Sequence, residues 1–219
     1  MLAYLAAGLV GTLLASLALA ELHREIFGRF VTHWDMAIQA WVHARASSRM
    51  NPWMELLSWV GGPLCAPPIC LGCALGFWRK HQRRAALLLV NSMLGSAILD
   101  TVLKLHFHRL RPEVPWSLVT EHSYSFPSGH SVAAAALYGT LLYLLLRLLH
   151  AWWVRGLACG IALAMALGIG YSRVYLGAHW PSDVLAGYCC GLIWVGSLMG
   201  ADLIVRRELP RALLAAAGR

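Results

Sequence analysis

Charged residues are scarce in this chain. Only 13% of its 219 residues are Asp, Glu, Lys or Arg, whereas 59% are hydrophobic, and the mean hydropathy is +0.61. Soluble domains contain about a quarter charged residues, so this deficit excludes an ordinary soluble domain and favours a membrane protein. Low-complexity stretches, internal repeats and a second domain boundary are also missing from the sequence. We therefore expect a single domain over residues 1–219.

Paired cysteines are missing as well. All six cysteines lie inside apolar runs, and Cys70-x2-Cys73 has neither a second pair nor a nearby histidine. A structural zinc site requires four such ligands, and a disulfide framework is typical of short, loop-rich chains. The cysteines are therefore predicted to be buried free thiols that pack as small apolar side chains.

Six apolar stretches approach or reach the length of about 20 residues with which a helix crosses a bilayer. They are residues 2–20, 53–78, 85–103, 130–149, 156–174 and 184–205. The second contains Gly61-Gly62-Pro63, which predicts a kink or a break. The first ends in a sequence similar to a signal-peptidase site, but no basic residue precedes it, so we expect a retained helix. The predicted fold is an all-α, integral membrane bundle of six transmembrane helices.

A segment of mixed character, residues 21–52, separates the first two stretches. Trp34, Ile38 and Trp41 recur at helical spacing, while Gln39 falls on another face. This pattern predicts a short amphipathic helix at the outer membrane interface. Two roles stay open for it, which are to shape entry to a site and to shield the bundle as a plain connector.

The formal net charge of +8 comes from basic residues in short connections between the apolar stretches. That distribution is typical of membrane topology and argues against nucleic-acid binding. The densest basic group, residues 79–84, lies in a very short connection and is expected in the cytoplasm. The sequence thus predicts a multi-pass plasma-membrane protein with both termini in the cytoplasm.

The remaining polar residues concentrate in three short strings. These are Lys104-x6-Arg111-Pro112, Pro127-Ser128-Gly129-His130 and Ser172-Arg173-x5-His179-x3-Asp183. The first begins at the end of the third predicted span, the second opens the fourth, and the third joins the last two. All three are therefore expected on the outer face of the membrane, where one site could collect them. Pro112 and Pro127 are interpreted as supporting residues that fix the backbone.

These residue types suit a phosphate group, which carries about two negative charges near pH 7. Lys104, Arg111 and Arg173 would neutralise that charge, and guanidinium groups bind its oxygens in pairs. Ser128 stands at the predicted N-cap of the fourth span, so the free N–H groups of that helix start would face the anion. Gly129 would permit close approach of the backbone.

The two histidines of the strings are predicted to take different roles. His179 and Asp183 are one helical turn apart, so the carboxylate can hold one ring nitrogen and leave the other as a nucleophile. His130 would stand at the opposite end of the phosphate, where it could protonate the departing oxygen.

Another acid lies unusually deep in a predicted span. Asp100 precedes Lys104 by four residues on the same helical face. A carboxylate at that depth is costly and indicates a function, and we interpret it as a partner that aims Lys104. A zinc cluster formed by His106, His108 and His122 is a less favoured alternative.

The three strings, in this order and spacing, resemble the signature of the type 2 phosphatidic acid phosphatase (PAP2) superfamily. The resemblance directly covers residues 104–183, and every motif position is filled. It implies a phosphatase without metal or cofactor, in which the histidine matching His179 forms a phosphohistidine and the one matching His130 acts as the acid. It also implies a lipid phosphate substrate on the periplasmic or outer face of a bacterial membrane. Undecaprenyl pyrophosphate is the preferred guess, followed by phosphatidylglycerol phosphate, phosphatidic acid and lipid A 1-phosphate.

Two other functions stay open at this point. A lipid phosphotransferase would use the same phosphoenzyme and pass the phosphoryl group to an acceptor other than water. A non-catalytic lipid transporter or scaffold would bind headgroups with the same cations and would not depend on His179.

Overall fold

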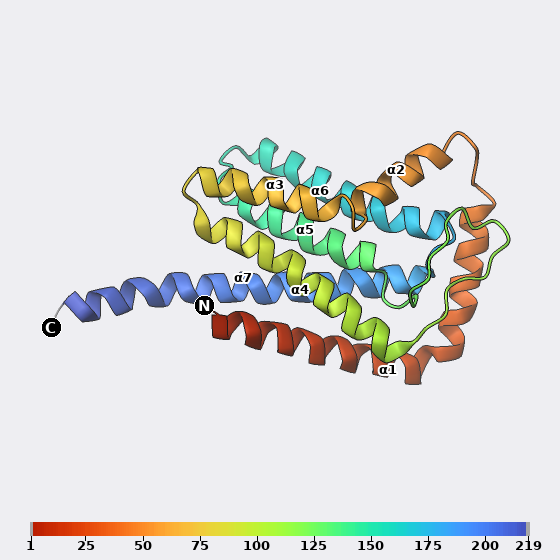
Figure 1. Cartoon of the computed structure of the whole chain (residues 1–219), viewed down its shortest axis with the longest axis horizontal. Coiled ribbons are helices and arrows are strands. Elements are labelled where there is room, and N and C mark those ends of the chain that lie inside the picture. Colours follow the sequence, from red (N-terminus) through yellow and green to blue (C-terminus); the bar gives the residue numbers. More distant parts are fainter. Residues whose placement is uncertain (1, 218–219) are drawn as a thin grey trace.

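The computed structural model describes the backbone of residues 2–217 and the side chains of residues 8–18, 21 and 33–206. Over this part the chain forms helices and no strands (Figure 1). The helices are α1 (Leu2–His43), α2 (Asn51–Gly61), α3 (Ala66–Arg79), α4 (Arg83–Phe107), α5 (Gly129–Leu146), α6 (Trp152–Tyr175) and α7 (Pro181–Ala217). The prediction of an all-helical membrane bundle is confirmed.

The count of six spans is not confirmed. Four helices are long and apolar enough to cross a bilayer, namely α4, α5, α6 and the Pro181–Arg206 part of α7. Helices α2 and α3 together form a fifth candidate span, bent by 56° at the break between them. Within the described residues, α1 contributes only a shorter apolar stretch, Gly8–Ala18.

The break in the second span occurs where the sequence predicts it. Helix α2 ends at Gly61, and α3 begins at Ala66 with prolines in its first turn. Proline is tolerated there because the N–H groups of a first turn have no intrahelical partner. A Cβ added to Gly61 would lie 2.4 Å from a side-chain carbon of Ile169, so only glycine lets α2 approach α6 this closely.

The prediction of a separate interfacial helix in residues 21–52 is wrong in one respect. This segment continues α1 without a break as far as His43, and it lies across one end of the bundle (Figure 1). Asp35, Gln39 and Val42 are buried on its inner face, whereas Trp34 and Trp41 are more than half exposed. The amphipathic pattern is therefore real, but the face turned towards the protein carries polar groups.

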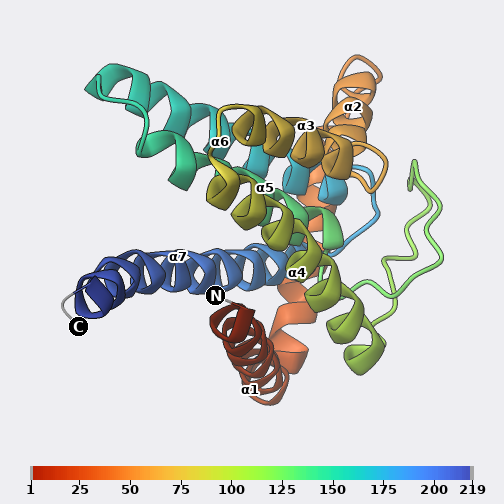
Figure 2. The ribbon, with the colours of Figure 1, turned by 60° about the vertical axis from the view of Figure 1, so that its left-hand side comes forward.

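Helix α5 occupies the centre of the bundle and packs against α4, α6 and α7. Its buried alanines and the glycines of α7 allow close approach, since a Cβ on Gly191 would lie 2.6 Å from that of Ala135. Helix α1 packs along α7 on the opposite side (Figure 2). Close helix contact through small residues is a common solution in membranes, where apolar burial gives little advantage over lipid.

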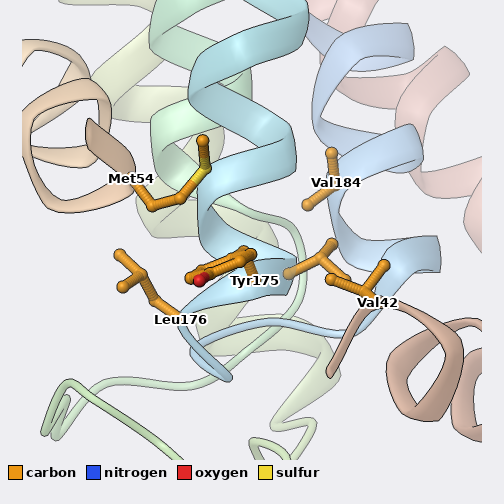
Figure 3. Packing of buried hydrophobic residues seen from close by; sticks show 6 residues of the cluster. Val42, Met54, Tyr175, Leu176 and Val184 are labelled. Carbon is orange, nitrogen blue, oxygen red and sulfur yellow. The ribbon is translucent and has the colours of Figure 1, made fainter. Parts of the chain in front are cut away.

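One apolar cluster fixes the end of the bundle over which α1 lies. Its buried members come from α1, α2, the end of α6 and the start of α7 (Figure 3). They are Val42, Met54, Val174, Tyr175, Leu176 and Val184. The Tyr175 hydroxyl also donates a 2.7 Å hydrogen bond to the side chain of Asn51. The third polar string runs from the end of α6 through the following turn into α7. Packing among these elements, α1 and α2 therefore fixes its position.

Candidate active site

The three polar strings meet at one end of the bundle, around a cavity of about 320 Å³. The walls come from the break between α2 and α3, the last turns of α4, the start of α5, and the loops that follow α4 and α6. Polar side chains that line it are Asp100, Lys104, Arg111, Glu121, His130 and His179. The prediction that the strings share one face of the bundle is confirmed.

His179 is held through one nitrogen of its ring. Nδ1 lies 3.6 Å from Oδ2 of Asp183 and 3.5 Å from the Ser125 hydroxyl, and both carboxylate and imidazole are at most 1% exposed. Nε2 lies 3.1 Å from Nη1 of Arg111, on the side of the cavity. Burial lowers the pKa of the His179 imidazole to about 4, so the ring is neutral at pH 7.

Asp183 is itself fixed by several donors. The Ser125 hydroxyl and the backbone N–H of Trp180 donate to Oδ2, the latter at 3.0 Å. Arg109 donates to Oδ1 at 2.5 Å. The carboxylate is fully buried, so an unsatisfied charge there would be costly, and this set of donors removes that cost.

Two of the three predicted phosphate-binding cations share one anion. Arg173 donates to Oε1 of Glu121 at 2.5 Å and to the hydroxyl of Ser58, and its guanidinium is only 2% exposed. Arg111 lies 3.7 Å from the other oxygen of Glu121. Burial raises the pKa of the Glu121 carboxyl, but the two guanidinium groups outweigh this effect and lower it below its usual range. Arg111 also donates to the carbonyl oxygens of Ser123 and Ala178, both at 2.7 Å.

The third cation, Lys104, pairs with Asp100. Its ammonium donates to Oδ2 of Asp100 at 3.0 Å. A Cβ added to Gly129 would lie 2.8 Å from the same carboxylate oxygen. Gly129 is therefore required for the packing of α5 against Asp100, in addition to the backbone approach expected from the sequence. Oδ1 of Asp100 is buried without a hydrogen-bond partner among the described residues.

Ser128 occupies the N-cap position of α5, as predicted, but its hydroxyl does not cap the helix. It accepts a hydrogen bond from the Ser131 hydroxyl at 3.1 Å instead. The Ser128 N–H donates to the carbonyl oxygen of Asp183 at 3.0 Å, which joins the second string to the third. Pro112 and Pro127 are buried beside these strings.

Two of the three histidines considered for zinc, His106 and His108, contact different partners. His106 lies 3.1 Å from a carboxylate oxygen of Glu21, and His108 packs edge-on against Tyr124. No group of three possible metal ligands occurs among the residues that were described.

Sequence reasoning missed several residues that hold the site together. Asp35 and Ser58 come from α1 and α2, outside the three strings, and Ser125 comes from the loop before the second string. Arg109 lies within the first string without a role assigned to it from the sequence, and the structure pairs it with two acids. The available signal for Asp35 was its spacing, since Asp35 and Gln39 are four residues apart and share a helical face.

Comparison with known proteins agrees with this geometry. The sequence model of the PAP2 superfamily matches residues 85–202. The chain is 36% identical over 142 residues to phosphatidylglycerophosphatase B of Bacillus subtilis, covering 64% of this chain and 68% of that protein. It is 33% identical over 124 residues to an undecaprenyl-diphosphatase of Sulfolobus acidocaldarius, covering 54% of this chain and 55% of the relative.

A solved structure is similar over nearly the whole chain. It is that of a transmembrane PAP2-type phosphatidylglycerolphosphate phosphatase from Bacillus subtilis, with a TM-score of 0.77 and 30% identity. The similarity covers 90% of this chain and 96% of that one. The helical bundle, the three strings gathered at one end and the match over residues 85–202 lead to one conclusion, that this chain belongs to the PAP2 superfamily and is a membrane phosphatase.

Proposed function

We propose that this protein hydrolyses the terminal phosphate of a membrane lipid through a phosphohistidine at His179. The observation that carries the proposal is the orientation of the imidazole. Nδ1 faces the Asp183 carboxylate and Nε2 faces Arg111 at the cavity. A neutral ring held at one nitrogen presents the lone pair of the other, and the depressed pKa of His179 keeps that pair available.

In the first step, Nε2 of His179 attacks phosphorus while the bond from phosphorus to the leaving oxygen breaks. His130, which lines the same cavity, donates the proton that this oxygen requires. Arg111 and Lys104, which line the cavity, neutralise the charge that spreads over the remaining phosphoryl oxygens, and Arg173 supports them through the Glu121 carboxylate that it shares with Arg111. The positive charge that develops on the His179 ring is balanced by Asp183.

In the second step, water attacks the same phosphorus and the bond to Nε2 breaks. The bonding electrons return to the ring, and His130 accepts the proton of the attacking water. Phosphate leaves, and both histidines regain their starting protonation states. Each group performs the reverse of its first task, as acid–base catalysis requires.

The proposed substrate class rests on where the cavity lies. It is lined near its polar end by Lys104 and Arg111 and farther along α4 by Ala97 and Met93. Met93 precedes Lys104 by three turns of helix, a distance of about 16 Å along the axis. A molecule with a phosphate head and an apolar tail fits such a lining, and the apolar length of the surrounding helices supports a tail that lies in the bilayer.

Among lipid phosphates, we expect phosphatidylglycerol phosphate first and undecaprenyl pyrophosphate second. The sequence alone favoured the reverse order. The relatives change it, because the similarity to the Bacillus subtilis phosphatidylglycerophosphatases extends over more of the chain. We further propose that the site faces the outer side of the plasma membrane, since the basic connection of residues 79–84 lies at the opposite end of the bundle.

The test measures phosphate release from these two lipids, phosphatidic acid and a lipid A 1-phosphate in detergent micelles. Wild type should release phosphate, and His179→Ala should lose at least about 1,000-fold in kcat. His150→Ala changes an exposed histidine at the other end of the bundle and should retain full activity. A His179→Ala enzyme as active as wild type would overturn the proposal.

Two further observations separate the alternatives. Radioactive phosphate from the substrate should remain on wild-type protein after rapid acid-free denaturation and be absent from His179→Ala. Release that depends on an added lipid alcohol would indicate a phosphotransferase.

Two inhibitor experiments test the cavity chemistry. Orthovanadate should inhibit by occupying the phosphate position. Activity should persist in excess EDTA, and a loss of activity reversed by zinc would contradict the metal-independent mechanism.

A further inference from the structure

A buried bridge of two acids and one arginine lies behind the histidine–aspartate pair. Nη1 of Arg109 donates to Oδ1 of Asp183 at 2.5 Å, and Nη2 donates to Oδ2 of Asp35 at 2.7 Å. The carboxylates of Asp35 and Asp183 are 3% and 0% exposed. One guanidinium thus joins two buried carboxylates that come from opposite parts of the sequence.

The bridge is reinforced by Ser182. Its backbone N–H donates to Oδ1 of Asp35 at 2.9 Å, and its hydroxyl donates to Oδ2 at 2.6 Å. Arg109 also donates to that hydroxyl at 2.7 Å. Both oxygens of Asp35 therefore have partners in the first turn of α7, next to Asp183. A second bond from the same helix, between Gln39 and the carbonyl oxygen of Val174 at 2.8 Å, fixes α1 to the end of α6.

These contacts lie on the side of Asp183 that faces away from His179. Arg109 uses Oδ1, whereas His179, Ser125 and the Trp180 N–H all approach Oδ2. Neither Asp35 nor Arg109 lines the cavity that contains His130 and His179. We therefore assign neither Asp35 nor Arg109 a direct contact with the substrate phosphate.

We infer that Arg109 and Asp35 are positioning residues, which hold the Asp183 carboxylate in the orientation that aligns His179 for attack. This inference rests on the proposed phosphohistidine chemistry. Oδ1 of Asp183 is bound by one N–H of Arg109 and Oδ2 by other donors, so rotation about the last bond of the side chain would break both sets of contacts, and Oδ2 stays directed at the ring. Asp35 fixes the other side of the fork and balances its charge, which leaves the negative charge of Asp183 available to the imidazolium.

The inference assigns a role to a helix that the family signature does not reach. The PAP2 match begins at residue 85, whereas Asp35 lies on α1. The second half of α1 would therefore be part of the catalytic apparatus and not merely a connector over the bundle. Its tryptophans Trp34 and Trp41 are exposed, while its buried acid contacts Arg109 and the first turn of α7.

The first experiment compares Arg109→Lys and Arg109→Gln with wild type, using the lipid phosphate that wild type hydrolyses best. Groups that orient a functional histidine from behind typically contribute about 10-fold to 100-fold to activity. We expect kcat to fall by that factor in Arg109→Gln while KM and the inhibition constant of vanadate change less than about threefold. Lysine keeps the charge but not the fork, so Arg109→Lys should recover only part of the loss.

The control variants change exposed charges at the same end of the bundle. Arg49→Gln removes a cation and Glu113→Gln removes an acid, and each side chain is exposed. Both should keep the wild-type kcat. Asp35→Asn should lower kcat about 10-fold with KM nearly unchanged, because the fork of Arg109 loses its second charged partner.

A double-mutant cycle separates positioning from general stability. If Arg109 acts through Asp183, then Arg109→Gln combined with Asp183→Asn should be no slower than Asp183→Asn alone. Independent, multiplied losses would overturn the inference, and so would an Arg109→Gln enzyme with wild-type kcat. The proposed function is tested separately by His179→Ala, so the inference can fail while the proposed function stands, and the two failures are distinguishable.

Discussion

Helix α7 carries two buried aspartates, each paired with arginine, at opposite ends of the bundle. Asp183 and Asp202 are 19 residues apart, about 28 Å along a helix, which is close to the thickness of the hydrocarbon core. Arg109 pairs with Asp183, and Arg111 and Arg173 lie nearby on Glu121. At the other end, Arg206 donates to Asp202 at 2.6 Å, and Arg84 and Arg147 lie 3.7 and 3.6 Å away. The residue types of the two clusters are thus nearly the same.

The clusters differ in how much water reaches their cations. The three arginines around Asp202 are 36–38% exposed, whereas at the Asp183 end Arg109 is 27%, Arg111 is 14% and Arg173 is 2% exposed. Water weakens the field of an exposed charge severalfold relative to a buried one. The Asp202 cluster therefore suits orientation in the membrane, and the Asp183 cluster suits binding and polarising a phosphate. Burial, and not composition, distinguishes a topology signal from an active site.

The largest contrast is expected between the two aspartates themselves. Asp183→Asn should reduce kcat roughly 1,000-fold to 10,000-fold, as loss of a histidine-orienting carboxylate does in serine proteases. Asp202→Asn should leave kcat within about twofold and only lower the thermal midpoint, because it removes a hydrogen-bonded ion pair far from the cavity. Steady-state kinetics give kcat, and a thermal melt in micelles gives the thermal midpoint, for each variant. A large loss of kcat in Asp202→Asn would show that the two ends are coupled.

A matched arginine pair sharpens the same contrast. Arg173→Lys should cost about 100-fold in kcat, since lysine lacks the fork that binds both Ser58 and Glu121, and Glu121 also pairs with Arg111 at the cavity. Arg147→Lys, at the Asp202 end, should change kcat by less than about twofold, because an exposed ion pair contributes little. Equal effects of the two substitutions on phosphate release would remove the distinction by burial.

A glycine pair tests packing instead of charge. Gly129→Ala would bring a methyl group to within 2.8–3.0 Å of three atoms of the Asp100 carboxyl group, so Asp100 and Lys104 must shift. We expect kcat/KM to fall about tenfold, since small displacements of binding groups are costly. Gly156→Ala meets no atom within 4 Å and should keep activity, with a slight gain in helix stability. Wild-type kinetics in Gly129→Ala would mean that the Asp100 and Lys104 pair tolerates displacement.

The smallest expected effect is a titration. Burial first, then the nearby guanidinium groups, outweigh the Asp183 carboxylate and lower the pKa of His179 to about 4, so the ring stays neutral down to about pH 5 and gains a proton only below it. An unperturbed histidine would titrate near 6.5. Nitrogen-15 spectra of histidine-labelled protein, with His179→Ala to assign the resonance, give the midpoint directly. A midpoint near 6.5 would contradict the buried, neutral nucleophile.

The sequence predicted the helical class, the break after Gly61, and the meeting of the three strings at one end of the bundle. Those features follow from local rules, namely apolar length, proline and glycine positions, and the alternation of spans. Its count of six spans is not confirmed, because within the described residues α1 contributes only the shorter apolar stretch Gly8–Ala18. It also assigned Gly129 to phosphate approach alone, whereas the packing of α5 on Asp100 requires it too.

By itself, the sequence determined the side-chain types and the spacing from which a phosphoryl-transfer site is proposed. Only the tertiary structure decided which acid each cation meets, and that Lys104 and Arg111 line the cavity whereas Arg109 does not. Lys104, Arg109, Arg111 and Arg173 look equivalent in a sequence, yet Arg109 is directed into a bridge with Asp35, more than 70 residues away. The reason is physical, since a buried carboxylate requires a partner, and which partner reaches it depends on helices that meet only in the folded bundle.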